Sequence, residues 1–129
     1  MKILLDTNAY VAFKHNHTEI VEKILGAERI LFSPIVLGEL LFGFRNGKKY
    51  KENQQDLQLF LENEAVEFLS MEQTTSDRYA RIAYQLKQQG TPMPMNDIWI
   101  AAHVFEHGAE LITSDRHFEK IPFLVCTIF

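Results

Sequence analysis

Four acidic side chains stand at positions where they could do chemistry together. Asp6, Asp97 and Asp115 come just after a predicted strand or just inside the start of a predicted helix. Glu39 lies in the helix that follows the second predicted strand. In open parallel sheets the carboxyl ends of the strands form the edge at which ligands bind. We therefore expect the four carboxylates to converge at this edge.

A cluster of carboxylates indicates that a cation binds among them. Acidic groups close together repel one another and would partly protonate unless positive charge were present. Oxygen ligands without a cysteine or a suitably spaced histidine pair favour Mg²⁺ or Mn²⁺ over zinc. Mg²⁺ held by one or two carboxylates keeps several waters, which leaves room for a substrate phosphate and for a water of lowered pKa that attacks phosphorus. The acids therefore predict metal-dependent hydrolysis of a phosphate ester.

Each acid also has an ordinary alternative role. Asp97, which follows Asn96, could simply complement a helix dipole, an effect worth about 0.3–1 kcal/mol. Asp115 could be a turn residue. Glu39 is the most informative of the four, because its neighbours in the helix are apolar and an unpaired carboxylate among them would be costly.

Two further groups of residues suggest other chemistry. Ser114, Asp115 and His117 are the residue types of a hydrolase triad, but residues so close in sequence rarely converge in that way. His103 and His107 have the spacing of zinc ligands on a helix, yet no acid of a metalloprotease motif accompanies them. We expect these two histidines to be a half-exposed pair on a helix.

The elements that must position the acids follow from short apolar runs. The run that follows Lys2 and ends at Leu5 is typical of a strand buried on both faces of a parallel sheet. Similar runs predict strands over residues 30–32, 66–69, 111–113 and 124–128. Helical spacing of apolar residues predicts helices over 9–13, 19–25, 35–44, 52–64, 74–89 and 97–107. This alternation favours right-handed crossovers and an α/β fold: three layers, α/β/α, with a five-stranded, mainly parallel sheet.

Several residues predict where helices begin and end. Ser33 is a good N-cap, and Pro34 suits the first position of the helix that carries Glu39. Asn96 is predicted to cap the helix that carries Asp97. Gly108 is expected to end that helix.

Bulk composition limits the class of protein. A chain of 129 residues with 47% hydrophobic residues is large enough for one well-filled domain, expected to span residues 1–129. The net charge of −4 counts against binding nucleic acid, but neutralising the four acids with metal would leave a remainder of zero. The single cysteine cannot form an internal disulfide, and no signal peptide or membrane-spanning run is evident, so we expect a cytoplasmic protein.

One turn is strongly basic in this otherwise acidic chain. Its four cations surround Asn46 and Gly47, and they are Arg45, Lys48, Lys49 and Lys51. Such a run is by default a solvated loop. It could also contact the phosphates of RNA and guide a substrate toward the metal.

With these residues assembled, the chain resembles the PIN-domain ribonucleases, and most closely the VapC-type toxins of bacterial and archaeal toxin–antitoxin pairs. The matching stretches are Leu-Leu-Asp-Thr-Asn at 4–8, Ser-Pro-Ile-Val-Leu-Gly-Glu-Leu-Leu-Phe-Gly at 33–43, Asn-Asp-Ile-Trp-Ile-Ala-Ala-His at 96–103 and Leu-Ile-Thr-Ser-Asp-Arg-His-Phe at 111–118. Each stretch alone is weak, whereas four in this order are a strong match over nearly the whole chain. The resemblance implies a PIN-like version of the predicted fold.

The resemblance also implies roles for particular residues. Asp6, Glu39, Asp97 and Asp115 match the family's acidic ligands of Mg²⁺ or Mn²⁺. The supporting polar residues near the metal or the scissile phosphate are Thr7, Asn8, Thr113 and Ser114, to which we add Asn96. The implied activity is cleavage of single-stranded or loop RNA, in tRNA or rRNA, leaving a 3′-hydroxyl and a 5′-phosphate. The family also forms dimers and is silenced by a VapB-type antitoxin in a hetero-oligomer.

An apolar surface could receive that antitoxin. Four large apolar residues cover more than one face of the helix that carries Glu39, and they are Leu40, Leu41, Phe42 and Phe44. Because the core cannot take all of them, some are expected to face outward as a partner site. The alternative is that these side chains fill the core or a homodimer interface.

Three other functions remain open at this point. An RNA-processing PIN nuclease outside a toxin–antitoxin pair would use the same acids, although the chain carries no additional RNA-binding or zinc module. A non-catalytic PIN-fold interaction domain is also possible, because fold does not determine function. A degenerate domain of that kind would be expected to lose some of the acids. A haloacid-dehalogenase-type phosphatase fits poorly, since it needs an aspartate where this chain has Asn8.

Overall fold

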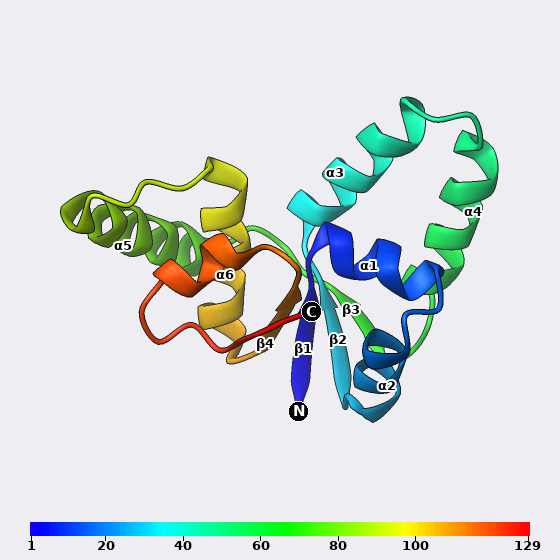
Figure 1. Cartoon of the computed structure of the whole chain (residues 1–129), viewed down its shortest axis with the longest axis horizontal. Coiled ribbons are helices and arrows are strands. Elements are labelled where there is room, and N and C mark those ends of the chain that lie inside the picture. The colour runs from blue at the N-terminus through cyan, green and yellow to red at the C-terminus, as the bar shows by residue number, and fades with distance from the viewer.

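A five-stranded sheet lies between two layers of helices in the computed structural model, which describes residues 1–129 (Figure 1). The strands are β1 (Lys2–Leu5), β2 (Arg29–Phe32), β3 (Val66–Phe68), β4 (Glu110–Thr113) and β5 (Cys126–Ile128). They run in the order β3-β2-β1-β4-β5, and every neighbouring pair is parallel. The α/β class and the five predicted strands are confirmed.

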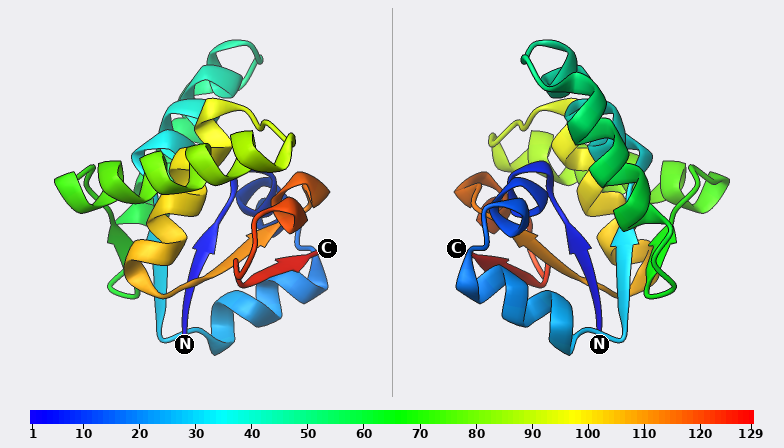
Figure 2. Two further views of the ribbon diagram at one scale, coloured as in Figure 1. Left: turned by 90° about the vertical axis from the view of Figure 1, so that its left-hand side faces the viewer. Right: turned by 90° about the vertical axis from the view of Figure 1, so that its right-hand side faces the viewer.

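Six α-helices and one short 3₁₀ helix connect the strands. They are α1 (Thr7–Lys14), α2 (Thr18–Gly26), α3 (Pro34–Arg45), α4 (Tyr50–Leu61), α5 (Gln73–Gln89), α6 (Met95–His107) and η1 (Arg116–Lys120). The pair α5 and α6 covers one face of the sheet, and α1 and α2 cover the other (Figures 1 and 2). The helices α3 and α4 form an arm that extends beyond the carboxyl ends of the strands. No helix is both long enough and apolar enough to cross a membrane.

The order of the strands reverses its direction at β1. The chain moves from β1 through β2 to β3 and then returns to the other side of β1 to form β4 and β5. In parallel sheets the point where this direction reverses is the usual place for a ligand. Leu5 at the end of β1 is in register with Ile112, so Asp6 and Thr113 leave the sheet side by side.

The core explains why the elements at this edge are well fixed. Leu4, Leu111 and Ile112 are fully buried in the two central strands, as the continuous apolar runs predicted. Helix α6 is also central, since Ile100 and Ala101 on it are fully buried. A helix packed in this way holds the residues of its first turn in a defined position.

The helix starts are only partly as predicted. Ser33 caps α3, because its Oγ accepts a hydrogen bond from the backbone N–H of Ile35 at 3.1 Å, and Pro34 is the first helical residue. The prediction for Asn96 is wrong. Pro94 is the N-cap of α6, and its carbonyl accepts from the N–H of Ile98, so Asn96 lies inside the first turn and is exposed.

The expectation of a half-exposed histidine pair is also wrong for His103. This side chain is fully buried; its Nδ1 lies 3.2 Å from Ser33 Oγ and its Nε2 lies 3.1 Å from the carbonyl oxygen of Ser70. Burial is the main reason why the pKa of His103 is lowered. His103 therefore joins the start of α3 to α6 and to the segment after β3.

Ser33→Ala tests this joint. The variant removes the α3 cap, which costs about 1 kcal/mol, and it leaves a buried ring nitrogen of His103 without a partner, which costs about 1–3 kcal/mol. We expect the free energy of unfolding in urea to fall by about 2–4 kcal/mol. Ser76→Ala, at an exposed position on α5, should change it by less than about 0.5 kcal/mol. Equal effects of the two variants would show that Ser33 does not hold the joint.

Candidate active site

Asp6 is the most tightly held of the four acids. It is the N-cap of α1 and is only 6% exposed. One carboxylate oxygen accepts the backbone N–H of Thr7 at 2.8 Å, and the other accepts the hydroxyl of Thr113 at 2.7 Å. Burial raises the pKa of Asp6, these two hydrogen bonds oppose the rise, and the charges of Glu39 and Asp115 add to it. The fold thus holds a buried carboxylate by two oriented donors.

Glu39 reaches the same edge from α3. Its Oε1 accepts a hydrogen bond of 2.7 Å from the hydroxyl of Thr7, which is the first residue of α1. Helical side chains lean toward the N-terminus of their helix, and in α3 that end is at the sheet edge. Thr7 therefore serves two acids, giving its backbone N–H to Asp6 and its hydroxyl to Glu39.

The loop after β4 places Asp115. Its backbone N–H donates to the hydroxyl oxygen of Thr113 at 3.0 Å, so Thr113 links Asp115 to Asp6. The Asp115 carboxylate caps η1 by accepting the N–H of His117 at 2.9 Å, and the His117 ring Nδ1 lies 2.9 Å from the same oxygen. The backbone N–H of Ser114, the residue before Asp115, donates to the side-chain oxygen of Asn8 at 3.1 Å. These contacts tie the β4 loop to the start of α1.

Asp97 differs from the other three acids because no hydrogen bond holds its carboxylate. It lies half-buried in the first turn of α6, as predicted. Burial, followed by the charges of Asp6, Asp115 and Glu39, raises the pKa of Asp97 to about 6, and His117 lowers it slightly. The carboxylate of Asp97 therefore lies within the field of all three other acids.

The edge thus carries four mutually repelling carboxylates, three of them connected through Thr7 and Thr113. No three His, Cys, Asp or Glu side chains are arranged so that they could hold one metal ion together. Among the supporting residues, Asn8 and Ser114 are joined by the hydrogen bond from the backbone N–H of Ser114 to the side-chain oxygen of Asn8. Asn96 lines a shallow pocket of about 360 Å³ together with Glu39 and Phe42. The sequence analysis did not predict that His117 would contact the carboxylate of Asp115 as a neighbour of the site acids. Its position two residues after Asp115 could have indicated this contact.

The basic turn does not lie at the acids. Arg45 comes six residues after Glu39, which is roughly 9 Å along α3, and the turn forms the tip of the helical arm (Figure 1). The Arg45 guanidinium stacks 4.5 Å above the Tyr50 ring. The remaining cations of the turn are exposed: Lys48, Lys49 and Lys51.

The expected apolar surface on α3 is mostly absent. Leu40 is only 3% exposed and belongs to the core, and Leu41 and Phe44 pack partly buried against it. The reason is that α3 has neighbours on several sides, since it contacts α1, α4 and α6. Phe42, at 67% exposed, is the one member of the predicted set that faces solvent.

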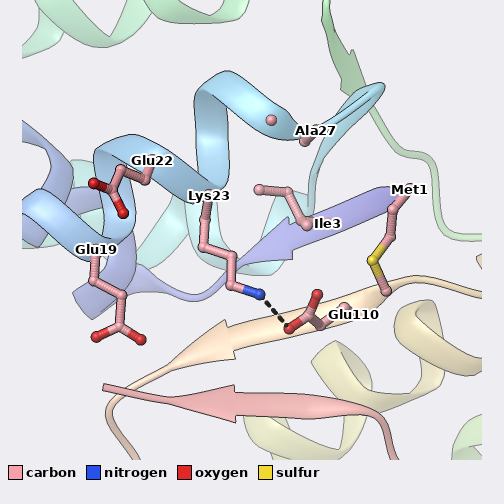
Figure 3. A pocket seen from close by; sticks show the side chains of 8 residues that line it. Met1, Ile3, Glu19, Glu22, Lys23, Ala27 and Glu110 are labelled. Carbon is pink, nitrogen blue, oxygen red and sulfur yellow. Dashed lines mark hydrogen bonds and ion pairs between the residues drawn. The ribbon is translucent and has the colours of Figure 1, made fainter.

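A separate pocket of about 290 Å³ lies at the opposite, amino-terminal edge of β1 and β4 (Figure 3). Its buried Glu110 is paired with Lys23 at 3.1 Å and also accepts a hydrogen bond from Thr127. These contacts satisfy the buried charge, as a buried carboxylate requires. Glu110 is therefore a structural acid and is not one of the site acids.

Comparison with known proteins agrees with this geometry. The family model described as PIN domain matches residues 3–124. Ribonuclease VapC2 of Rickettsia felis is 32% identical over 133 residues, which cover 97% of this chain and 96% of the relative. The tRNA(fMet)-specific endonuclease VapC of Salmonella typhimurium is 29% identical, over 95% of this chain and 93% of that protein.

The solved structures agree as well. The crystal structure of VapBC2 from Rickettsia felis, bound to a DNA fragment from its promoter, superposes on the whole chain with a TM-score of 0.86. It covers 100% of this chain and 99% of the other, at 28% identity. The chain therefore belongs to the PIN-domain family, and within that family to the VapC-type ribonucleases.

The raised pKa of Asp97 predicts an unusual pH dependence. The folded state binds this proton with a pKa of about 6, against 3.8 for an ordinary aspartate, so the unfolded state binds it less strongly. Stability from this group should therefore increase as the pH falls from about 6 to about 4. Asp97→Asn should remove this gain and stabilise the protein at pH 7 by about 1 kcal/mol, allowing for solvent screening.

The measurement is urea unfolding of both proteins in EDTA between pH 7 and pH 4. The difference between the two curves isolates Asp97, because His103 titrates in both proteins. The matched control is Asp77→Asn, which changes an exposed aspartate paired with Arg81 on α5. A difference curve for Asp97→Asn as flat as that of the control would mean that neither burial nor the other acids raise the pKa of Asp97.

Proposed function

We propose that this protein is a metal-dependent endoribonuclease that acts as the toxin of a toxin–antitoxin pair. The observation that supports the proposal most strongly is the group of four carboxylates, Asp6, Glu39, Asp97 and Asp115, at the switch point of a parallel sheet. In a non-catalytic domain nothing would require four like charges to be kept so close. The relatives named ribonuclease and tRNA(fMet)-specific endonuclease match nearly the whole chain.

The chemistry of the donor set fits Mg²⁺ or Mn²⁺. The four acids present carboxylate oxygens to a metal ion, and no cysteine lies among them. The pKa values of two of the acids, Asp6 and Asp97, are raised. Asp6, Glu39, Asp97 and Asp115 would hold the ion once their side chains turn toward a common point, since no three of them surround one point in this structure. When bound, such a cation would supply charge to offset that developing on the phosphate and would lower the pKa of an attacking water.

Neighbouring polar residues of the chain hold the site acids in position. Thr7 and Thr113 fix Asp6 through both of its oxygens, and Thr7 also orients Glu39. The bond between Ser114 and Asn8 sets the distance between the β4 loop and α1. Asp97, without a hydrogen bond of its own, keeps acceptor capacity for an ion or for a water that loses a proton.

The substrate we propose is RNA, in single-stranded or loop regions of tRNA or rRNA. The product ends would be a 3′-hydroxyl and a 5′-phosphate. The basic turn at the tip of the arm, defined above, would attract the RNA backbone. Its cations stand roughly 9 Å or more along α3 from Glu39, a distance that a strand of one or two further nucleotides would span.

The partner we propose is a VapB-type antitoxin, within an assembly that also contains a toxin homodimer. The Rickettsia felis relative was solved as VapBC2 bound to promoter DNA. On this chain, the exposed Phe42 lines a shallow pocket with Glu39 and Asn96. A partner that covers Phe42 could place an Arg or Lys against Glu39, which would block the site by charge as well as by bulk.

Asp6→Asn tests the nuclease. The substitution keeps the shape but removes a charged ligand, so cleavage of total RNA in Mg²⁺ should fall by about 100-fold or more, and EDTA should abolish cleavage by the wild type. Mg²⁺ should also raise the melting temperature of the wild type and not that of the variant. Asp77→Asn should behave as wild type. Cleavage that survives both EDTA and Asp6→Asn would refute the metal mechanism.

Phe42→Glu tests the partner surface. After co-expression with the reading frame immediately upstream of the gene, size-exclusion chromatography should give a heteromeric complex with suppressed nuclease activity. Phe42→Glu should weaken this complex while leaving the melting temperature within about 2 °C, because the side chain is exposed. Leu59→Glu on α4, where Leu59 is 68% exposed, is the matched control and should leave the complex intact. Equal retention of the complex by both variants would exclude Phe42 from the interface.

A further inference from the structure

A second cavity lies beside the candidate site, between α1 and the helical arm. Its volume is about 520 Å³, within the range of roughly 300–1,000 Å³ that is usual for ligand sites. Tyr10 and Lys14 of α1 line it, together with Phe44 of α3, Lys49 of the basic turn, and Asn53 and Asp56 of α4. Tyr10 comes three residues after Thr7, so the cavity begins roughly 5 Å along α1 from the acids.

The hydroxyl of Tyr10 is the only buried side-chain oxygen or nitrogen that has no hydrogen-bond partner. Its ring is fixed by edge contacts with Phe32 at 6.0 Å and Phe60 at 5.3 Å between ring centroids. Burial, followed by the charge of Asp56, raises the pKa of Tyr10 to about 12, so the hydroxyl keeps its proton. Buried donors without acceptors are rare in folded proteins, and this one lines a cavity that could admit an acceptor.

The cavity is lined by charges of both signs. Lys14, Lys49 and Glu52 are exposed, Asn53 and Asp56 are partly buried, and the side chains of Lys14 and Asp56 are equally exposed, at 41%. Lys14 Nζ and Asp56 Oδ2 form an ion pair at 3.6 Å, a distance too long for a hydrogen bond. The Asp56 carboxylate therefore keeps its acceptor capacity.

We propose that this cavity binds a nucleobase of the substrate RNA, guanine in preference to the others, within one or two nucleotides of the cleaved bond. This proposal rests on the function proposed above. The Watson–Crick edge of guanine has two adjacent N–H groups, which a carboxylate such as Asp56 accepts, and a carbonyl oxygen, to which the Tyr10 hydroxyl donates. Phe44 offers an apolar wall for the base, and Lys14 and Lys49 offer cations for the flanking phosphates.

The mixture of charges favours a nucleotide over a peptide side chain. An arginine or lysine entering the cavity would meet Lys14 and Lys49, and an acidic side chain would meet Glu52 and Asp56. A nucleotide can interact with both the cations and the carboxylates of the cavity, because its phosphate is anionic and the edge of guanine presents hydrogen-bond donors. Recognition of single-stranded RNA commonly combines base-edge hydrogen bonds with contacts to aromatic rings.

The first experiment measures binding without catalysis. Guanosine 5′-monophosphate is titrated into the ¹⁵N-labelled protein in EDTA and followed by NMR. We expect shifts of the backbone amides of α1 and α4, and weaker binding of adenosine 5′-monophosphate. Tyr10→Phe removes only the hydroxyl, so it should weaken guanosine monophosphate binding by about 3- to 10-fold without lowering the midpoint of unfolding. Tyr84→Phe, at an exposed tyrosine of α5, should leave binding unchanged.

The second experiment measures specificity during cleavage. Short RNA strands with guanosine, inosine or adenosine at each position near the cut are offered to wild type, Tyr10→Phe and Asp56→Asn in Mg²⁺. We expect the wild type to prefer guanosine over inosine, which lacks the exocyclic amine, and Asp56→Asn to lose that preference through KM. Cleavage by the wild type with no base preference, or variants with an unchanged preference, would overturn the proposal.

The two proposals can fail separately. If the wild type cuts no RNA in Mg²⁺ or Mn²⁺, the proposed function fails, whereas the titration still tests the cavity. If N-acetylarginine methylamide shifts the α1 and α4 amides and guanosine monophosphate does not, the cavity belongs to a protein partner and the nucleobase proposal is wrong.

Discussion

Repulsion among like charges is the constraint on which the structure at the sheet edge depends. Burial, followed by the charges of the three other site carboxylates, raises the pKa of Asp97 to about 6. The fold offsets part of this cost with hydroxyl and amide donors from Thr7 and Thr113, which serve Asp6 and Glu39. Valine, which has a similar size, would keep the backbone amide but would lose the hydroxyl donor at either position. The threonines are thus as much a part of the site as the acids.

The parallel sheet determines which acids meet. Because β1 and β4 are neighbours on either side of the point where the strand order reverses, residues more than a hundred positions apart become adjacent. The hydrogen bond between Thr113 and Asp6 follows directly from this register. Asp97 reaches the same edge for a different reason: the buried face of α6, including the His103 contact with Ser33, fixes the angle of that helix.

The fold could be predicted largely from local signals, and the site only in part. The cap at Ser33, the left-handed stop at Gly108 and the short apolar strands are local features, and the structure has them. The bond between Thr7 and Glu39 joins residues 32 positions apart, so no local pattern shows it. The burial of His103 and Leu40 depends on which helices pack together, which periodicity alone does not specify.

The distribution of charge has a consequence for how an acidic protein can bind RNA. The net charge is −4, which equals the charge of the four site acids when all are ionised, so the rest of the chain is neutral. A neutral body gains little affinity from phosphates, because that affinity requires an excess of Lys and Arg. The few cations that could meet RNA are concentrated in the basic turn and at Lys14. Most of the binding energy must therefore come from shape and from contacts to bases, and such contacts carry sequence information that phosphate contacts lack.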